Sequence, residues 1–264
     1  MQTTGPGPAP GPASANAGLP INHIIGTQQA RSLHLRVHAD RLPNGRLNHD
    51  ASVAFANQAA GDSSTLVMYS DGSGNYRNHH EPQWTGVAVA WKRRDELLYH
   101  VAGSTIPRPM ESDQMEICAV NEGMSTALVE RWSQVESQVV VLMDNIIALQ
   151  VIRDWVPGQG GANERVLQRL KKYDDFFAAQ GVPVVVRFLK GRRFVEGHDI
   201  ADVWARQLST PRESFKHSGN QTQWYHARER HMFTKIMIWH KAVDDNDELE
   251  GEWNRFERRV AQQS

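Results

Sequence analysis

Apolar residues between positions 65 and 209 fall into short runs and periodic stretches that are separated by turn-forming residues. Short runs rich in β-branched and aromatic residues predict strands. Five such runs predict five strands, at 66–70, 85–91, 97–102, 139–143 and 182–189. Short links join the first three, which indicates an antiparallel meander. The fourth run is apolar at every position, as is typical of a strand buried on both faces.

Apolar residues at helical spacing predict four helices, at 113–132, 145–155, 163–180 and 198–208. Asp113 is placed to cap the first of them. The order of elements is therefore β-β-β-α-β-α-α-β-α. A meander followed by β-α-β crossovers predicts an α/β fold, with a mixed five-stranded sheet flanked by helices.

The two ends of the chain differ from this central domain of residues 65–209. Residues 1–64 read as a leader, disordered over the Pro/Gly/Ala-rich first 20 residues and loosely ordered after them. Residues 210–264 read as a linker and a helical C-terminal extension, which we expect to pack on the domain or to bind a protein partner. Apolar residues at helical spacing carry this prediction: Trp224, Phe233, Ile236, Met237 and Trp239 in one stretch, and Leu249, Trp253, Phe256 and Val260 in another.

Composition narrows the class of protein. The net charge is −1, so any surface that binds nucleic acid must be local. Cys118 is the single cysteine, which rules out an internal disulfide. No run of 18 apolar residues predicts a membrane span, and the N-terminus does not resemble a secretory signal. We therefore expect an intracellular protein, nuclear or cytoplasmic rather than mitochondrial.

Four acids are the candidates for chemistry. Asp71 and Asp144 each follow a predicted buried strand, and Glu116 and Asp202 lie in predicted helices. An acid at the end of a buried strand is costly unless it is paired, and a divalent metal is the usual partner of clustered carboxylates. Taken singly, Asp71 also fits a turn, Asp144 a helix cap and Asp202 a solvated surface.

Glu116 competes with Glu122 for the second position in this set. Glu116 shares a helical stripe with Ala119, Gly123 and Ala127, whose small side chains allow close packing on a sheet. The neighbours of Glu122 make a weaker packing face. We therefore favour Glu116 as the acid that faces the sheet.

Four segments resemble, in order, the motifs of the ribonuclease H superfamily, type 1, and look most like domains of fungal retroelements. They are Tyr69-Ser70-Asp71-Gly72-Ser73-Gly74, Met115-Glu116-Ile117, Met143-Asp144-Asn145 and Gly197-His198-Asp199-Ile200-Ala201-Asp202. Two departures stand out. Arg192 follows Lys190-Gly191 where the family usually has a histidine, and His198 stands where it usually has asparagine.

The resemblance implies a ribonuclease H-like fold and an endonuclease that cleaves the RNA strand of RNA/DNA hybrids. Asp71, Glu116, Asp144 and Asp202 would hold two Mg²⁺ ions, with Mn²⁺ as a substitute. The candidate substrate contacts are Ser73, Asn75, Asn145, Lys190, Arg192, Arg193 and His198. For His198, helix capping remains an alternative. Two other functions stay open: an inactive retroelement-derived domain that binds nucleic acid or protein, and a nuclease acting on DNA or single strands.

Overall fold

The structure, a computed structural model, describes residues 24–74, 84–93, 96, 98–106, 108–131, 137–191 and 195–209, together with the backbone of two strands, 219–226 and 233–242. The described strands form one mixed sheet in the order β1-β2-β7-β6-β3-β4-β5-β9-β8.

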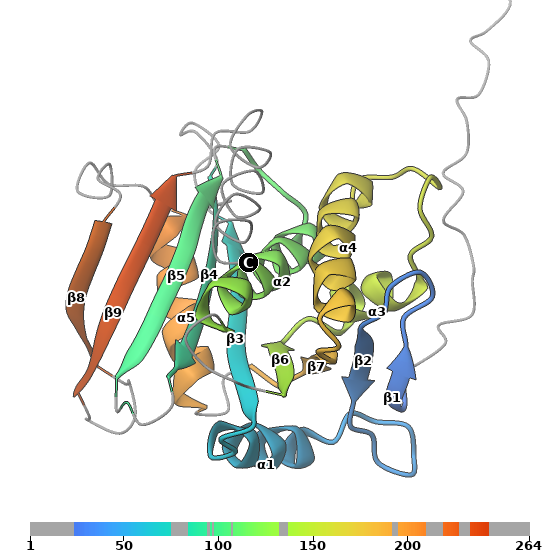
Figure 1. Cartoon of the computed structure of the whole chain (residues 1–264), viewed down its shortest axis with the longest axis horizontal. Helices are drawn as coiled ribbons and strands as arrows, with labels where there is room; N and C mark the ends of the chain where they lie inside the picture. The colour runs from blue at the N-terminus through green and yellow to red at the C-terminus, as the bar shows by residue number, and fades with distance from the viewer. Residues whose placement is uncertain are drawn as a thin grey trace, which may run out of the picture.

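The five predicted strands are confirmed and form the centre of this sheet. They are β3 (Thr65–Gly74), β4 (Thr85–Lys92), β5 (Tyr99–Ile106), β6 (Gln138–Met143) and β7 (Val184–Phe188). β3, β4 and β5 form the antiparallel meander, and β6 lies between β3 and β7, parallel to both. Figure 1 shows these strands side by side.

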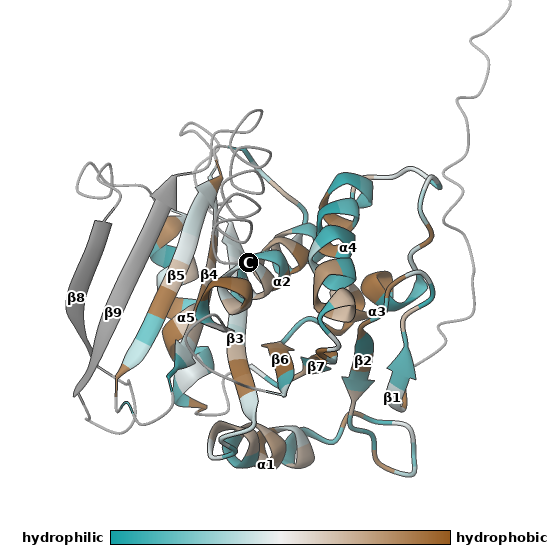
Figure 2. Cartoon of the chain, viewed as in Figure 1, coloured by the Kyte–Doolittle hydropathy of each residue, from teal (hydrophilic) through white to brown (hydrophobic). Residues whose placement is uncertain are grey.

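Helices cover both faces of the sheet. The core on one face includes α2 (Ser112–Arg131), α3 (Ile146–Asp154) and α4 (Glu164–Ala179), and α5 (Glu196–Leu208) covers the other. Successive side chains of β3 point to opposite faces of the sheet, so this strand contributes to both cores. Met68 packs on the α2 side, and Val67 and Tyr69 pack on the α5 side. Figure 2 shows the apolar strands β6 and β7 and the polar outer surface of α4.

The stripe of small residues on α2 faces the sheet, as the sequence predicts. Ala119 and Ala127 are fully buried. A Cβ atom added at Gly123 would lie 3.3 Å from the Cγ1 atom of Val141 in β6. The prediction that Asp113 caps this helix is wrong, because α2 already begins at Ser112.

The described part of the leader is ordered, so the prediction of a loosely ordered segment is wrong for residues 24–64. It contains β1 (Gly26–Gln29), β2 (Arg36–Ala39) and α1 (His49–Ala60). β2 pairs in parallel with β7, and β1 pairs with β2. The predicted disorder of the first 20 residues lies outside the described residues. The sheet gains these strands because Ile24, Leu35 and Val37 are fully buried in the same core as β6 and β7.

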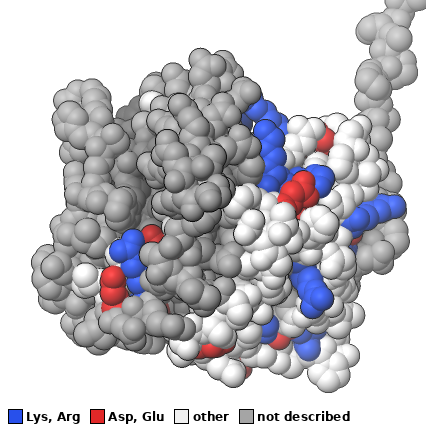
Figure 3. All heavy atoms as spheres, in the orientation of Figure 1, with Lys and Arg blue, Asp and Glu red and all other residues white. Residues whose placement is uncertain are grey.

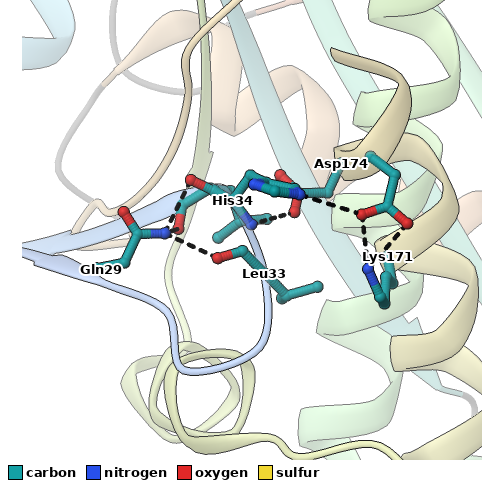
Figure 4. Close-up of polar contacts among 7 residues, drawn as sticks. Gln29, Leu33, His34, Lys171 and Asp174 are labelled. Atoms are coloured by element: carbon teal, nitrogen blue, oxygen red, sulfur yellow. Dashed lines mark hydrogen bonds and ion pairs between the residues drawn. The ribbon is translucent and has the colours of Figure 1, made fainter. Parts of the chain in front are cut away.

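Side-chain hydrogen bonds fix the turn between β1 and β2 (Figure 4). The Nε2 atom of Gln29 donates to the carbonyl oxygens of Leu33, His34 and Leu35 at 2.8, 2.9 and 3.1 Å. The buried carboxylate of Asp174 on α4 accepts from the backbone N–H of His34. This turn is therefore bound to the helix layer of the central domain.

The prediction of a helix in the first part of the C-terminal extension is wrong, because this part forms two strands. β8 (Gly219–His226) and β9 (Phe233–Ala242) occupy the first stretch that the sequence analysis predicts as helix. β9 pairs in parallel with β5, and β8 pairs with β9. Pairing supplies hydrogen-bond partners along an edge that β5 would otherwise expose. The second predicted helix, 249–260, lies outside the described residues. Among the described helices, none combines the length and the apolar character needed to cross a membrane.

Candidate active site

The strand register places two of the predicted acids at the same edge of the sheet. Tyr69 of β3 pairs with Leu142 of β6, the last pair of that parallel ladder. Asp71 lies two residues after Tyr69, and Asp144 lies two residues after Leu142. The side chain of Asp71 is buried, whereas that of Asp144 is partly open to solvent.

Helices α2 and α5 bring the other two acids to this edge. A pocket of about 230 Å³ is lined by Asp71, Gly72, Ser73, Glu116, Asp144, His198, Asp199, Asp202 and Arg206. The four acids expected from the sequence therefore share one pocket, although they come from two strand ends and two helices.

Gly72 allows α2 to approach β3 closely. A Cβ atom at this position would lie 2.7 Å from the carbonyl carbon of Met115, which is closer than real contacts permit. The backbone N–H of Gly72 donates to the carboxylate of Glu116. The glycine after Asp71 thus brings the first turn of α2, and with it Glu116, to the pocket.

Glu122 lies elsewhere, so the preference for Glu116 is confirmed in its placement. The carboxylate of Glu122 accepts from the hydroxyl of Ser104 at 2.8 Å, in a separate hollow that Arg165 and Arg169 also line. Glu116 is 5% exposed and lines the acidic pocket. Because Glu122 lies six residues after Glu116, the two side chains are about 120° apart around the helix axis, and only Glu116 points into the pocket.

One face of α5 presents a histidine, an acid and an arginine to the pocket. His198, Asp202 and Arg206 are spaced four residues apart, so they lie in a row along the helix. The Nε2 atom of His198 lies 3.6 Å from the Oδ2 atom of Asp144, and Arg206 pairs with Asp202 at 2.7 Å. The interpretation of His198 as a helix cap is wrong, because α5 begins at Glu196.

Burial and crowding shift the ionisation of the pocket. Burial raises the pKa of Asp71 to about 8, and the charges of Asp144 and Asp202 add to the rise. Burial also raises the pKa of Glu116 well above its ordinary range, as do the charges of Asp71 and Asp144. For His198, burial lowers the pKa, but the surrounding carboxylates outweigh it and the value rises to about 9. The described residues alone therefore do not compensate the full charge of this pocket.

The residues present fit a divalent cation. The Oε2 atom of Glu116 is buried and has no hydrogen-bond partner among the described residues. Ligand atoms of Asp71, Asp144 and His198 all lie within 4.8 Å of one another. Carboxylate oxygens are the donors that Mg²⁺ and Mn²⁺ prefer. A cation here would supply the missing partner of Glu116 and neutralise the cluster.

The predicted substrate contacts divide into three groups. Ser73 and His198 line the pocket. Asn145 instead caps α3, since its Oδ1 atom accepts from the backbone N–H groups of Ile147 and Ala148. The alternative interpretation of Asp144 as this cap is therefore wrong. Lys190 is exposed and is not among the pocket residues. Asn75, Arg192 and Arg193 lie outside the described residues.

Sequence reasoning missed two residues that line the pocket, Asp199 and Arg206. A signal was available for Arg206, because an arginine four residues after an acid on a helix is placed to pair with it. Asp199 gave a weaker signal, as a polar residue between buried helix positions. Across the face drawn in Figure 3, basic and acidic side chains of the described residues occur in small interleaved groups.

Three comparisons with known proteins bear on this architecture. No family model matches the chain, and no curated protein matches it. Solved structures of ribonucleases H1 are similar to it over about half of its length. The enzyme of Halobacterium salinarum NRC-1 is 17% identical, with 55% of this chain and 96% of that chain covered and a TM-score of 0.36.

Two further structures are similar to the same extent. The N-terminal RNase H domain of a Mycobacterium tuberculosis protein is 15% identical, covering 55% of this chain and 98% of that chain at a TM-score of 0.39. LC11-RNase H1, in complex with an RNA/DNA hybrid, is 10% identical, covering 54% of this chain and 97% of that chain at a TM-score of 0.41. The strand order β7-β6-β3-β4-β5, its antiparallel meander and its two helical crossovers give this chain a ribonuclease H-like fold, similar to type 1 ribonucleases H.

Proposed function

We propose that this protein is a metal-dependent endonuclease that hydrolyses the RNA strand of RNA/DNA hybrids. The observation that carries the proposal is the gathering of Asp71, Glu116, Asp144 and Asp202 in one pocket, from four separate elements. A fold gains no stability from bringing four carboxylates together, since each is desolvated and repels the others. Such a cluster is therefore expected where a cation is held for function.

The described residues of the pocket carry too little positive charge to replace that cation. Arg206 pairs with Asp202, and His198 lies beside Asp144. Glu116 keeps one buried oxygen without a hydrogen-bond partner among the described residues. We expect this oxygen and the carboxylates of Asp71, Asp144 and Asp202 to hold two Mg²⁺ ions, with Mn²⁺ as a substitute.

Bound divalent cations supply Lewis-acid stabilisation of a phosphate and lower the pKa of an attacking water. The chain itself contributes fixed ligand positions and a site for the scissile phosphate. Ser73 lines the same pocket and offers a hydroxyl to a sugar or phosphate oxygen. The expected products carry a 5′-phosphate and a 3′-hydroxyl.

The choice of an RNA/DNA hybrid as substrate comes from the four ordered motifs, which resemble those of type 1 ribonuclease H. Proteins that recognise such duplexes read their shape and their 2′-hydroxyl groups rather than base edges. A net charge of −1 agrees with a short contact surface beside the pocket rather than an extended basic one.

A cleavage assay on matched duplexes tests the proposal. Three substrates are each incubated with the full chain and Mg²⁺ or Mn²⁺. They are an RNA/DNA hybrid and a double-stranded RNA, both with a 5′-labelled RNA strand, and a labelled DNA duplex. We expect cleavage of the hybrid alone, abolished by EDTA and by Asp71→Asn. Binding of the hybrid without cleavage would favour an inactive nucleic-acid-binding domain, and cleavage of the DNA duplex would favour a deoxyribonuclease.

A further inference from the structure

His198 lies directly beside the carboxylates of the acidic pocket. Its side chain is 3% exposed, and its Nε2 atom lies 3.6 Å from the Oδ2 atom of Asp144. Ligand atoms of His198, Asp71 and Asp144 lie within 4.8 Å of one another. Donor atoms around one cation at bond lengths of about 2.1 Å are separated by roughly 3 to 4 Å, so a small closing movement brings these three donors to coordination distance.

The backbone leaves room for this arrangement at one glycine. A Cβ atom at Gly191 would lie 2.1 Å from the Oδ2 atom of Asp144 and 3.3 Å from the Nε2 atom of His198. The chain after β7 therefore passes directly over the Asp144–His198 pair, and any larger residue would fill the space between backbone and carboxylate. The absence of a side chain keeps both donor atoms accessible from the pocket.

A second observation points to a ligand in the same pocket. The Oε2 atom of Glu116 is buried, lines the pocket and has no hydrogen-bond partner among the described residues. The Nδ1 atom of His198 likewise has none. A buried carboxylate oxygen without a partner is costly, and a bound cation removes that cost. His198 lines the same pocket as Glu116.

We propose that His198 ligates a divalent cation through an imidazole nitrogen, together with Asp71 and Asp144, and that this nitrogen raises the affinity of the site for Mn²⁺ relative to its affinity for Mg²⁺. The inference rests on the metal site of the proposed function, but it requires neither a particular substrate nor cleavage. Mg²⁺ is a hard cation that strongly prefers oxygen ligands. Mn²⁺ is the weakest binder among the divalent first-row transition metals, but it accepts an imidazole nitrogen more readily than Mg²⁺ does. An all-carboxylate site would lack this discrimination.

Nitrogen coordination can be measured on the unmodified full chain. Pulsed electron paramagnetic resonance of the protein loaded with Mn²⁺ alone should show modulation from a directly bound imidazole nitrogen. In His198→Asn that modulation should disappear. Binding titrations should show Mn²⁺ affinity falling by about 10- to 100-fold in this variant, while Mg²⁺ affinity changes much less.

His100 provides the matched control. It is also 3% exposed and also lies beside a carboxylate, that of Glu96, but on β5 and outside the pocket residues. His100→Asn should keep both the nitrogen modulation and the Mn²⁺ affinity. Gly191→Ala should weaken Mn²⁺ binding, because the added methyl group intrudes on the Asp144 carboxylate.

The outcomes separate this inference from the nuclease proposal. Mn²⁺ bound without nitrogen modulation, or an unchanged Mn²⁺/Mg²⁺ affinity ratio in His198→Asn, would overturn the role of His198 even if the hybrid is cleaved. Nitrogen modulation in a protein that cleaves no hybrid would support His198 as a ligand and overturn the nuclease. Failure of the wild-type chain to bind Mn²⁺ would overturn the ligand role outright.

Discussion

At the scale of single residues, Glu116 and Glu122 show how position on one helix determines the role of an acid. Both lie on α2, yet Glu116 lines the acidic pocket and Glu122 accepts a hydrogen bond from Ser104 outside it. This contrast makes them a matched pair for mutation, because the chemical change is the same and only the surroundings differ.

We expect Glu116→Gln to lower the rate of hybrid cleavage by about 100-fold or more, as removal of a preorganised charged group from an active site does. Glu122→Gln should stay within a few-fold of the wild type. Steady-state cleavage at saturating Mg²⁺ measures both. Equal losses in the two variants would mean that α2 acts through its fold rather than through a pocket carboxylate.

The raised pKa of Asp71 makes the stability of the metal-free protein depend on pH. Its folded-state pKa is about 8 and its ordinary value is 3.8, so between these values the folded state holds a proton that the unfolded state has released. The free energy of unfolding therefore falls as pH rises through this window. The pKa of His198 is raised from 6.5 to about 9, so the free energy of unfolding also falls between these pH values.

Urea unfolding in EDTA between pH 5 and 9 should accordingly give midpoints that decrease with pH. Asp71→Asn should flatten the decrease, and Mg²⁺ should restore stability most at the upper end, because a bound cation stabilises the ionised form. A midpoint that stays constant or rises with pH in EDTA would contradict the assignment of a buried, protonated carboxyl group.

At the scale of elements, the sequence predicted the central strands and helices because their local patterns and their tertiary environment agree. The run of 139–143 is apolar throughout and lies between two parallel neighbours. Strands β1 and β2 were missed because each is four residues long, and β2 is stabilised by β7, which lies far along the chain. Such pairing is a non-local contribution that no local pattern contains.

The C-terminal strands were misassigned for a related reason. Phe233, Ile236 and Met237 occur at helical spacing, yet the same segment is rich in residues that favour strands. Pairing with the edge of β5 decides between these readings. The acids of the pocket were predictable because each follows or faces a well-defined element. The spacing of Arg206 from Asp202 indicates only a surface ion pair, and the structure shows that this pair lines the pocket.

The close packing of α5 on β4 depends on Gly86. A Cβ atom at Gly86 would lie 2.1 Å from the carbonyl oxygen of Ala205 and 2.4 Å from the backbone nitrogen of Ser209. Gly86→Ala should cost about 1–3 kcal/mol of stability, because backbone must move. Because α5 carries Asp202, the same shift should also weaken metal binding.

Gly123→Ala is the comparison, since its Cβ would meet only side-chain atoms: the Cγ1 atom of Val141 at 3.3 Å, and atoms of Met68 and Val89 at 3.7 Å. Alanine also gains about 1 kcal/mol of helix propensity over glycine, which offsets a modest clash. Denaturant unfolding and calorimetric Mg²⁺ titration of both variants measure the difference. A Gly86→Ala protein as stable as the wild type would show that α5 does not rest on β4 as described.

At the scale of the whole molecule, the N-terminal segment and the central domain share one core. Leu35, Val37 and Ala39 pack in the same cluster as Val141 and Val186 of the central strands. Three hydrogen bonds from Gln29 and the contact of Asp174 with His34 hold the intervening turn in place. We therefore expect the described residues 24–64 to unfold together with the central strands as one cooperative unit.

Leu35→Ala tests this unity, because Leu35 is fully buried although it lies in the segment that sequence alone assigned to a loose leader. We expect a loss of about 2–5 kcal/mol, as for other leucines removed from a packed core. Unfolding followed by far-ultraviolet circular dichroism and by tryptophan fluorescence should still give one coincident transition at a lower midpoint.

Leu42→Ala is the control. At this site, which is 41% exposed, the substitution should change the free energy of unfolding by no more than about 0.5 kcal/mol. Two separated transitions in Leu35→Ala would instead mean that β1, β2 and α1 dissociate while the acidic pocket stays intact, and the metal affinity of that intermediate would then equal that of the wild type.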